Sequence, residues 1–262
     1  APVSSTLAGH NDMQSLPVRS VVNEAAQVVW RKRATLFPAL IGTGLALAIL
    51  ETASFYIVGE HPRWLLIALL GIVRAVLATW FAVTCHRVVL LEDGATPRYG
   101  IHSWSGREMR FLGWTLVGVF YLLVSVVIVA IPAAIISGGR DLFSDYPMLW
   151  LPVALPGAYV SARLSVLLPA TAIGKRFDMS WAWETTSGNG WRLLVVVGLL
   201  PFLFDTLIED VEAVGFVALV FIVRVVGFAL LAFEIAALSI SFRFLTRTAN
   251  SEEACNAAPL AG

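Results

Sequence analysis

Long apolar stretches constrain this chain more than any other feature of its sequence. They cover residues 35–58, 64–91, 112–136, 147–173, 191–208 and 213–245. A helix needs about 20 apolar residues to cross the hydrocarbon core of a bilayer, whereas the strands of membrane barrels are short and alternate in polarity. The sequence therefore predicts an all-α integral membrane protein with six transmembrane helices in three hairpins.

The composition agrees with a membrane protein. Of the 262 residues, 58% are hydrophobic and 14% are charged, whereas a soluble domain is about half apolar and about a quarter charged. The net charge is zero and there is no long basic run, which argues against a nucleic-acid partner. The partners that we expect are membrane lipids and the subunits of a larger membrane complex.

Prolines interrupt the fourth and fifth apolar stretches. The fourth contains Pro152, Pro156 and Pro169, and a proline inside a helix removes a hydrogen bond and clashes with the preceding turn. We therefore expect this helix to be kinked or broken. The fifth stretch is short and contains Pro201.

Lysine and arginine are distributed unequally between the two sets of loops. Thirteen flank the stretches on the side of the N-terminus, and only Arg63 and Arg140 lie on the opposite side. Because positive residues are retained in the cytoplasm, we expect both termini to be cytoplasmic and the protein to lie in a bacterial inner membrane.

Residues 18–33 have the pattern of an amphipathic helix. Valines and alanines recur at spacings of three and four and a basic cluster follows, as in helices that lie along a membrane surface. Residues 101–114 and 178–194 show a similar pattern. The expected organisation is a disordered or extended tail over 1–17, this interfacial helix, a transmembrane domain over 34–247 and a C-terminal tail over 248–262.

A shift of 77 residues aligns residues 86–104 with residues 163–181 without a gap. The match is either a true internal repeat or a chance likeness between two apolar segments. Both interpretations remain open at the level of sequence.

Ionisable residues inside the apolar stretches are the candidate site residues, since such residues are costly in a membrane and often functional. They are Arg163, Glu234, Glu51, Arg74, Arg224 and Asp205. Arg163 and Glu234 lie at similar depth, roughly 15 Å from the cytoplasmic ends of their helices, so we expect them to form an ion pair. Glu51 and Arg74 lie in adjacent helices of one hairpin. Such pairs either fix the helices relative to one another or line a proton path, an ion path or a lipid-headgroup site.

Motifs for catalysis, for a metal or for a cofactor were not found in the sequence. The four histidines form no His-Glu-x-x-His motif, and the cysteines and histidines lack metal-ligand spacing. There is no Gly-x-Ser-x-Gly and no phosphate-binding glycine loop. We therefore expect a protein that is not an enzyme and carries no cofactor.

One region resembles a known family. Leu168-Pro169-Ala170 is followed by Trp181 and Trp183, a turn with Gly188 and Asn189, and Arg192 at the start of the next helix. This order resembles the YciC-like bacterial inner-membrane proteins and the related membrane region fused to some glycerophosphodiester phosphodiesterases. The resemblance implies a six-helix cytoplasmic-membrane protein with no assigned reaction, and the phosphodiesterase domain itself is absent from the sequence.

Two functions are compatible with these features. The first is an accessory, assembly or membrane-organising subunit that acts through protein and lipid contacts. The alternative is a small transporter or lipid-handling protein that uses the broken fourth helix and Arg163, because proline-interrupted spans beside membrane charges are typical of transporters.

Overall fold

The computed structural model describes residues 15–58, 64–91, 104–136, 150–199, 201–202 and 216–257, and every secondary-structure element in these ranges is a helix. Within them, the helical stretches long and apolar enough to cross a membrane are Arg33–Ser54, Trp64–Leu90, Gly106–Pro132, Val153–Ala172 and Val217–Arg247. The prediction of an all-helical fold is confirmed for the described residues, and these helices are compatible with several membrane spans. The span expected at 191–208 is described only in part, as a shorter apolar helix over Gly190–Leu199.

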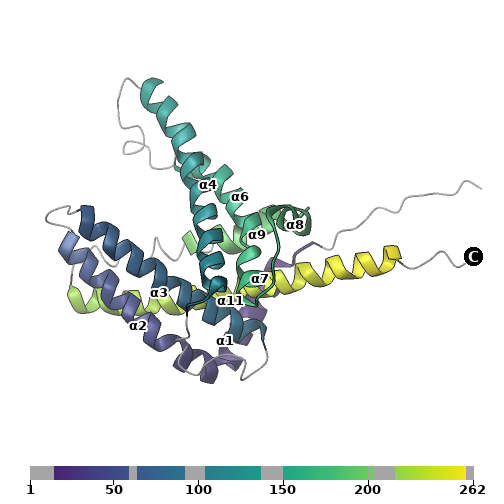
Figure 1. The fold of residues 1–262 in the computed structure, drawn as a ribbon, viewed down its shortest axis with the longest axis horizontal. Coiled ribbons are helices and arrows are strands. Elements are labelled where there is room, and N and C mark those ends of the chain that lie inside the picture. The colour runs from purple at the N-terminus through teal and green to yellow at the C-terminus, as the bar shows by residue number, and fades with distance from the viewer. Residues whose placement is uncertain are drawn as a thin grey trace, which may run out of the picture.

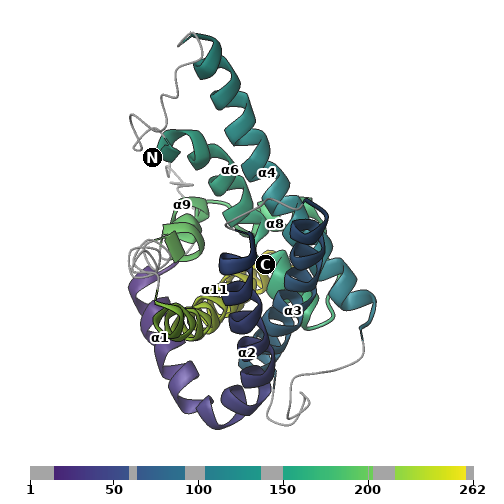
Figure 2. The same cartoon turned by 90° about the vertical axis from the view of Figure 1, so that its left-hand side faces the viewer.

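The helices are α1 (Val18–Arg31), α2 (Arg33–Val58), α3 (Trp64–Leu90), α4 (Gly106–Ile136), α6 (Trp150–Leu164), α7 (Leu167–Ala172), α8 (Met179–Thr185), α9 (Gly190–Leu194), the π-helical η2 (Val195–Leu199) and α11 (Val217–Ala257). The α2–α3 hairpin packs on α11, and the α4–α6 hairpin projects in a different direction (Figures 1 and 2). Helix α11 runs past residue 247, where the transmembrane domain was expected to end.

The buried core lies at one end of the spans, next to α1. We call this end, where α2 begins and α3 ends, the α1 end, and the opposite end the far end. Phe81, Cys85 and Val88 of α3 belong there to one buried cluster with Ala236 and Ile240 of α11. Toward the far end, α3 and α4 diverge (Figures 1 and 2). The chain is therefore held together mainly at the α1 end.

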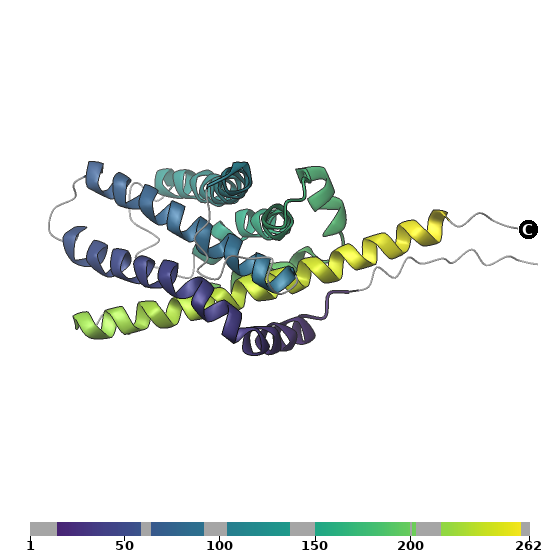
Figure 3. The ribbon, with the colours of Figure 1, turned by 60° about the horizontal axis from the view of Figure 1, so that its bottom comes forward.

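Helix α1 lies across α11 at the α1 end (Figure 3). Its face of Val21, Ala25 and Val28 is buried in the core. The helix is where the sequence predicts it, but this face contacts protein rather than lipid. The end of the expected tail is anchored as well, because Leu16 is buried and its N–H donates to Asn189 Oδ1 at 2.7 Å. Residues 1–14 lie outside the described ranges.

The fourth apolar stretch is broken, as predicted, between α6 and α7. The break falls at Ser165, four residues before Pro169. Pro169 has no N–H to donate to the Ser165 carbonyl, and its ring would clash with that carbonyl in a continuous helix. The carbonyl instead accepts the N–H of Leu168 at 3.0 Å.

Helices α4 and α6 pack closely through small residues and interhelical hydrogen bonds. Ser125 Oγ donates to the Val153 carbonyl at 2.7 Å, and Ser161 Oγ donates to the Gly118 carbonyl at 2.8 Å. A Cβ on Gly157 would lie 2.6 Å from the Tyr121 carbonyl oxygen. Glycine therefore allows the two backbones to approach, as small residues do between membrane helices.

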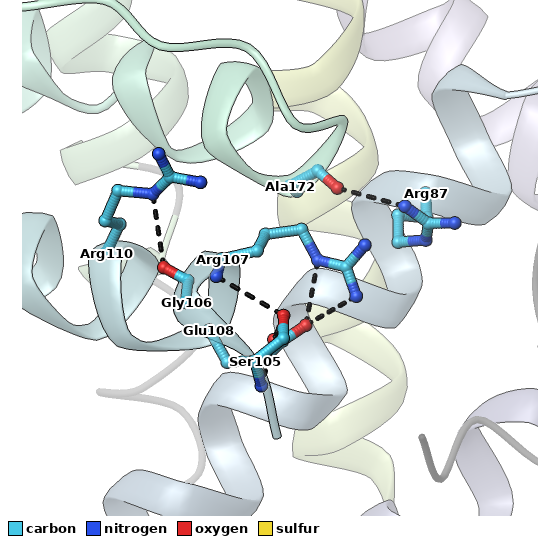
Figure 4. A network of polar contacts seen from close by, with 7 residues as sticks. All are labelled: Arg87, Ser105, Gly106, Arg107, Glu108, Arg110 and Ala172. Atoms are coloured by element: carbon cyan, nitrogen blue, oxygen red, sulfur yellow. Dashed lines mark hydrogen bonds and ion pairs between the residues drawn. The ribbon is translucent and has the colours of Figure 1, made fainter. Parts of the chain in front are cut away.

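A capping box explains why α4 begins at Gly106. The buried Glu108 carboxylate accepts the Ser105 N–H at 2.9 Å and the Ser105 hydroxyl, while Arg107 pairs with its other oxygen at 2.6 Å (Figure 4). Ser105 Oγ in turn accepts the Arg107 N–H at 3.3 Å. This Ser-x-x-Glu arrangement satisfies amides that the first helical turn leaves open. The expectation of a separate surface helix over 101–114 is corrected, because residues from Gly106 onward belong to the long α4.

Candidate functional site

The described membrane charges toward the far end meet at one carboxylate. Glu51 of α2 forms ion pairs with Arg74 Nε of α3 at 3.0 Å and with Arg224 Nη1 of α11 at 3.2 Å. The opposite charges of Glu51 and Arg74, expected in adjacent helices, are thus in contact, and Arg224 shares the same acid. Asp205 lies outside the described residues.

Arg74 lies near the middle of its helix, whereas Glu51 and Arg224 each lie seven residues from the far end of theirs. Arg74 is ten residues from the first residue of α3, Trp64, and sixteen from its last, Leu90, which corresponds to about 15 Å and about 24 Å along the helix. The hydrocarbon core is about 30 Å thick. If α3 crosses the bilayer, Arg74 therefore lies close to the midplane.

A cavity of about 430 Å³ adjoins the cluster. Glu51, Arg74, Arg224 and Glu234 line it together with apolar residues of α11 and of the η2 region. Glu234 therefore faces the same cavity as the other three charges.

The three side chains of the cluster differ in exposure. The Glu51 side chain is 13% exposed and the Arg224 side chain 28%, whereas the Arg74 side chain is 65% exposed. Arg74 pairs with Glu51 through Nε, and Glu51 is its ion-pair partner in the part of the chain that the structure describes. One arginine of the cluster therefore keeps most of its side chain exposed beside this ion pair.

Arg163 lies in a second site, at the junction of α6 and α8. Its Nε donates to Thr186 Oγ1 at 2.8 Å, and its Nη2 donates to the Trp183 carbonyl. The guanidinium carbon lies 3.6 Å from the centroid of the Trp183 ring, an arrangement that attracts a cation to the aromatic face. The residue is only 7% exposed.

These contacts overturn the predicted ion pair between Arg163 and Glu234. Arg163 donates through Nε to a hydroxyl and through Nη2 to a carbonyl, whereas Glu234 lines the cavity beside Glu51. The last carbonyls of a helix lack hydrogen-bond donors and carry partial negative charge. A cation at the end of α8 supplies both a donor and a compensating positive charge. Arg163 therefore acts as a structural link between α6 and α8.

His86 is buried in α3, and its Nδ1 lies 2.8 Å from Ser239 Oγ of α11. It joins these two helices by a hydrogen bond, while His102 lies outside the described residues. Among the described residues there is no group of three or more histidine, cysteine, aspartate or glutamate side chains that could hold a metal ion.

Comparison of this chain with protein-family models, with curated proteins and with solved structures gives no match. Function is therefore inferred from the helices and from the two charge sites.

Proposed function

We propose that this chain is a non-enzymatic, multi-pass membrane protein that acts by contact, as an accessory or assembly subunit of a membrane complex. The observation that carries the proposal is the separation of the two hairpins toward the far end. In the apolar window of Gly106–Pro132 only 6% of the residues are buried, against 56% in Val153–Ala172.

A transport path favours spans that surround a common axis from one side of the membrane to the other. Here α3 and α4 diverge (Figure 1). Their arrangement therefore does not favour a transport path between them. Membrane helices associate by close packing and polar contacts, since lipid tails are as apolar as leucine. The flanks of α4 offer such packing surfaces to other membrane helices.

Photo-crosslinking tests this function. We expect a photoreactive amino acid at Leu123 of α4, which is 58% exposed, to give one discrete protein adduct in native membranes. The same probe at Ser125, which is 8% exposed, is the matched control and should give none. Adducts with lipid alone at Leu123, together with a chain that purifies without other subunits, would contradict a contact function.

We further propose a six-span topology in a bacterial inner membrane, with residues 191–208 as the fifth span and both termini cytoplasmic. The excess of basic residues on the side of the N-terminus supports this orientation, and the sequence resemblance to the YciC-like family supports the number of spans.

Thiol labelling tests the orientation. In a Cys255→Ser background, a membrane-impermeant maleimide applied from outside should label Leu65→Cys, at the far end of α3, and should spare Arg31→Cys. Leu65 is 86% exposed and Arg31 is also exposed, so burial does not prevent either reaction. The reverse labelling pattern would show that the termini face outward.

A second function, lipid handling, is favoured by the charged cavity of about 430 Å³. Arg163 is a poor candidate for holding a headgroup, because its guanidinium is already bonded at the end of α8. A lipid phosphate would therefore bind at the cavity, where Arg74 has exposed donors. The Arg74 variants described below distinguish this outcome from a protein contact.

A further inference from the structure

We infer that Arg74 is the contact point for a carboxylate on a transmembrane helix of another protein. This inference rests on the proposed contact function and names the chemistry of the partner. Arg74 presents terminal guanidinium nitrogens at a side chain that is 65% exposed, on a helix whose neighbouring residues Ile72 and Val73 face outward.

An exposed guanidinium near the midplane requires an acceptor, because membrane-embedded charges are costly unless they are paired or hydrated. The described acids of this chain near Arg74 are engaged. Glu51 binds two arginines, and Glu234 has an interaction of its own. A second copy of this chain would bring Glu51 and Glu234 in the same engaged state, so the described membrane acids of the chain leave the carboxylate to a different protein.

The depth of Arg74 favours a helix over a lipid headgroup. The headgroup layer begins about 15 Å from the midplane, and Arg74 lies only three residues from the centre of α3, or about 5 Å along the helix. A long side chain can bend toward the surface, but the ion pair between Nε and Glu51 at 3.0 Å favours the position that this one has. A carboxylate on a neighbouring membrane helix reaches this depth without disturbing the bilayer.

The surface beside Arg74 also suits a helix. Gly71 lies three residues before Arg74, on the same face of α3. It is exposed, and a Cβ added to it would meet nothing within 4 Å. Open space at a glycine lets the backbone of a second helix approach closely, which brings its acid within reach of Arg74.

The test uses defined peptides as partners. The probe is a 21-residue leucine–alanine transmembrane helix with one central glutamate and a fluorescent acceptor, and the matched peptide has alanine at that position. The full chain carries a donor dye on Cys255, and energy transfer is measured in phosphatidylcholine vesicles. We expect the glutamate peptide to bind roughly tenfold more tightly than the alanine peptide, given the strength of polar contacts between membrane helices.

Variants of Arg74 should change this preference in a set order. Arg74→Leu should abolish it, Arg74→Lys should retain most of it, and Arg74→Glu should instead prefer a peptide with a central lysine. Arg74→Leu should still fold, because Glu51 keeps its contact with Arg224. Arg31→Leu, which removes an exposed arginine at the α1 end, is the control and should leave the preference unchanged.

Two results would overturn the inference. One is equal binding of the glutamate and alanine peptides, or a preference that survives in Arg74→Leu. The other is a phospholipid that remains with the purified wild-type chain in native mass spectrometry and is lost in Arg74→Leu, without any peptide preference, since this identifies a headgroup as the acceptor. The discrete adduct at Leu123 does not depend on Arg74, so its presence or absence judges the contact function separately.

Discussion

Replacement of Glu51 by leucine should lower the free energy of unfolding by about 3 kcal/mol, a typical cost for leaving a buried charge without its partner. Glu51 is the carboxylate that Arg74 and Arg224 share, at 3.0 Å and 3.2 Å. Arg224, whose side chain is 28% exposed, should account for most of the loss. The 65% exposed Arg74 should contribute less, because exposed pairs contribute little.

The loss of stability in Glu51→Leu should depend on the two arginines that Glu51 no longer pairs with. The double variant Glu51→Leu, Arg224→Leu should recover most of the stability, because it removes, together with the acid, the more buried of the two arginines that pair with Glu51. The measurement is unfolding of the purified protein in mixed micelles, followed by tryptophan fluorescence. A double variant that is as unstable as Glu51→Leu alone would show that Arg224 does not depend on Glu51.

Thr52→Val is the matched control for Glu51→Leu. Thr52 is the next residue of α2 and is buried, and its hydroxyl has no hydrogen-bond partner among the described residues. A buried hydroxyl without a partner is unfavourable, so its removal should leave the stability unchanged or raise it slightly. Opposite effects at two adjacent positions would separate the loss of the ion pairs from a general disturbance of α2.

Features that depend on neighbouring residues could be predicted from the sequence. The break in the fourth stretch follows from the missing N–H of Pro169 four residues later. Residues 18–33 were predicted to form a helix because of their apolar spacing. The sequence alone could not show that α11 rather than lipid covers Val21 and Val28, because the same apolar face suits either environment.

The partners of the membrane charges could be predicted only in part. Position along a helix gives the depth of a residue but not the face on which it lies. Glu51 and Arg74 belong to one hairpin, so their helices were expected to touch. Arg163 and Glu234 share a depth, but α6 packs mainly on α4 and α9, whereas α11 packs mainly on α1, α2 and α3.

Two further contacts have a recognisable pattern in the sequence. Ser105 and Glu108 have the spacing of a capping box. The end of α8 needs donors for its last carbonyls, and Arg163 was the buried cation available to supply them. The rotation of α6 that brings Arg163 to Thr186 and Trp183 depends on tertiary packing, which no local pattern records.

Replacement of Arg163 by methionine should lower the free energy of unfolding by about 2 to 3 kcal/mol. The change removes two hydrogen bonds from a charged donor, which contribute about 1.5 to 3 kcal/mol each when measured singly, and the contact with the Trp183 ring. Methionine fills part of the volume, and the Thr186 hydroxyl keeps its bond to the Ala182 carbonyl at 2.7 Å. The expected loss is therefore smaller than the sum of the contacts.

A double-mutant cycle with Glu234→Leu decides whether Arg163 has an acidic partner. Because Arg163 bonds to Thr186 and Trp183, the two changes should be additive within about 0.5 kcal/mol. The exposed Arg192, which lies 3.4 Å from Asn189 Oδ1, provides the control: Arg192→Met should change the stability by no more than about 0.5 kcal/mol. Recovery of stability in the double variant Arg163→Met, Glu234→Leu would instead support the ion pair that the sequence predicts. Additive losses would establish Arg163 as the residue that fixes α8 to the broken fourth span.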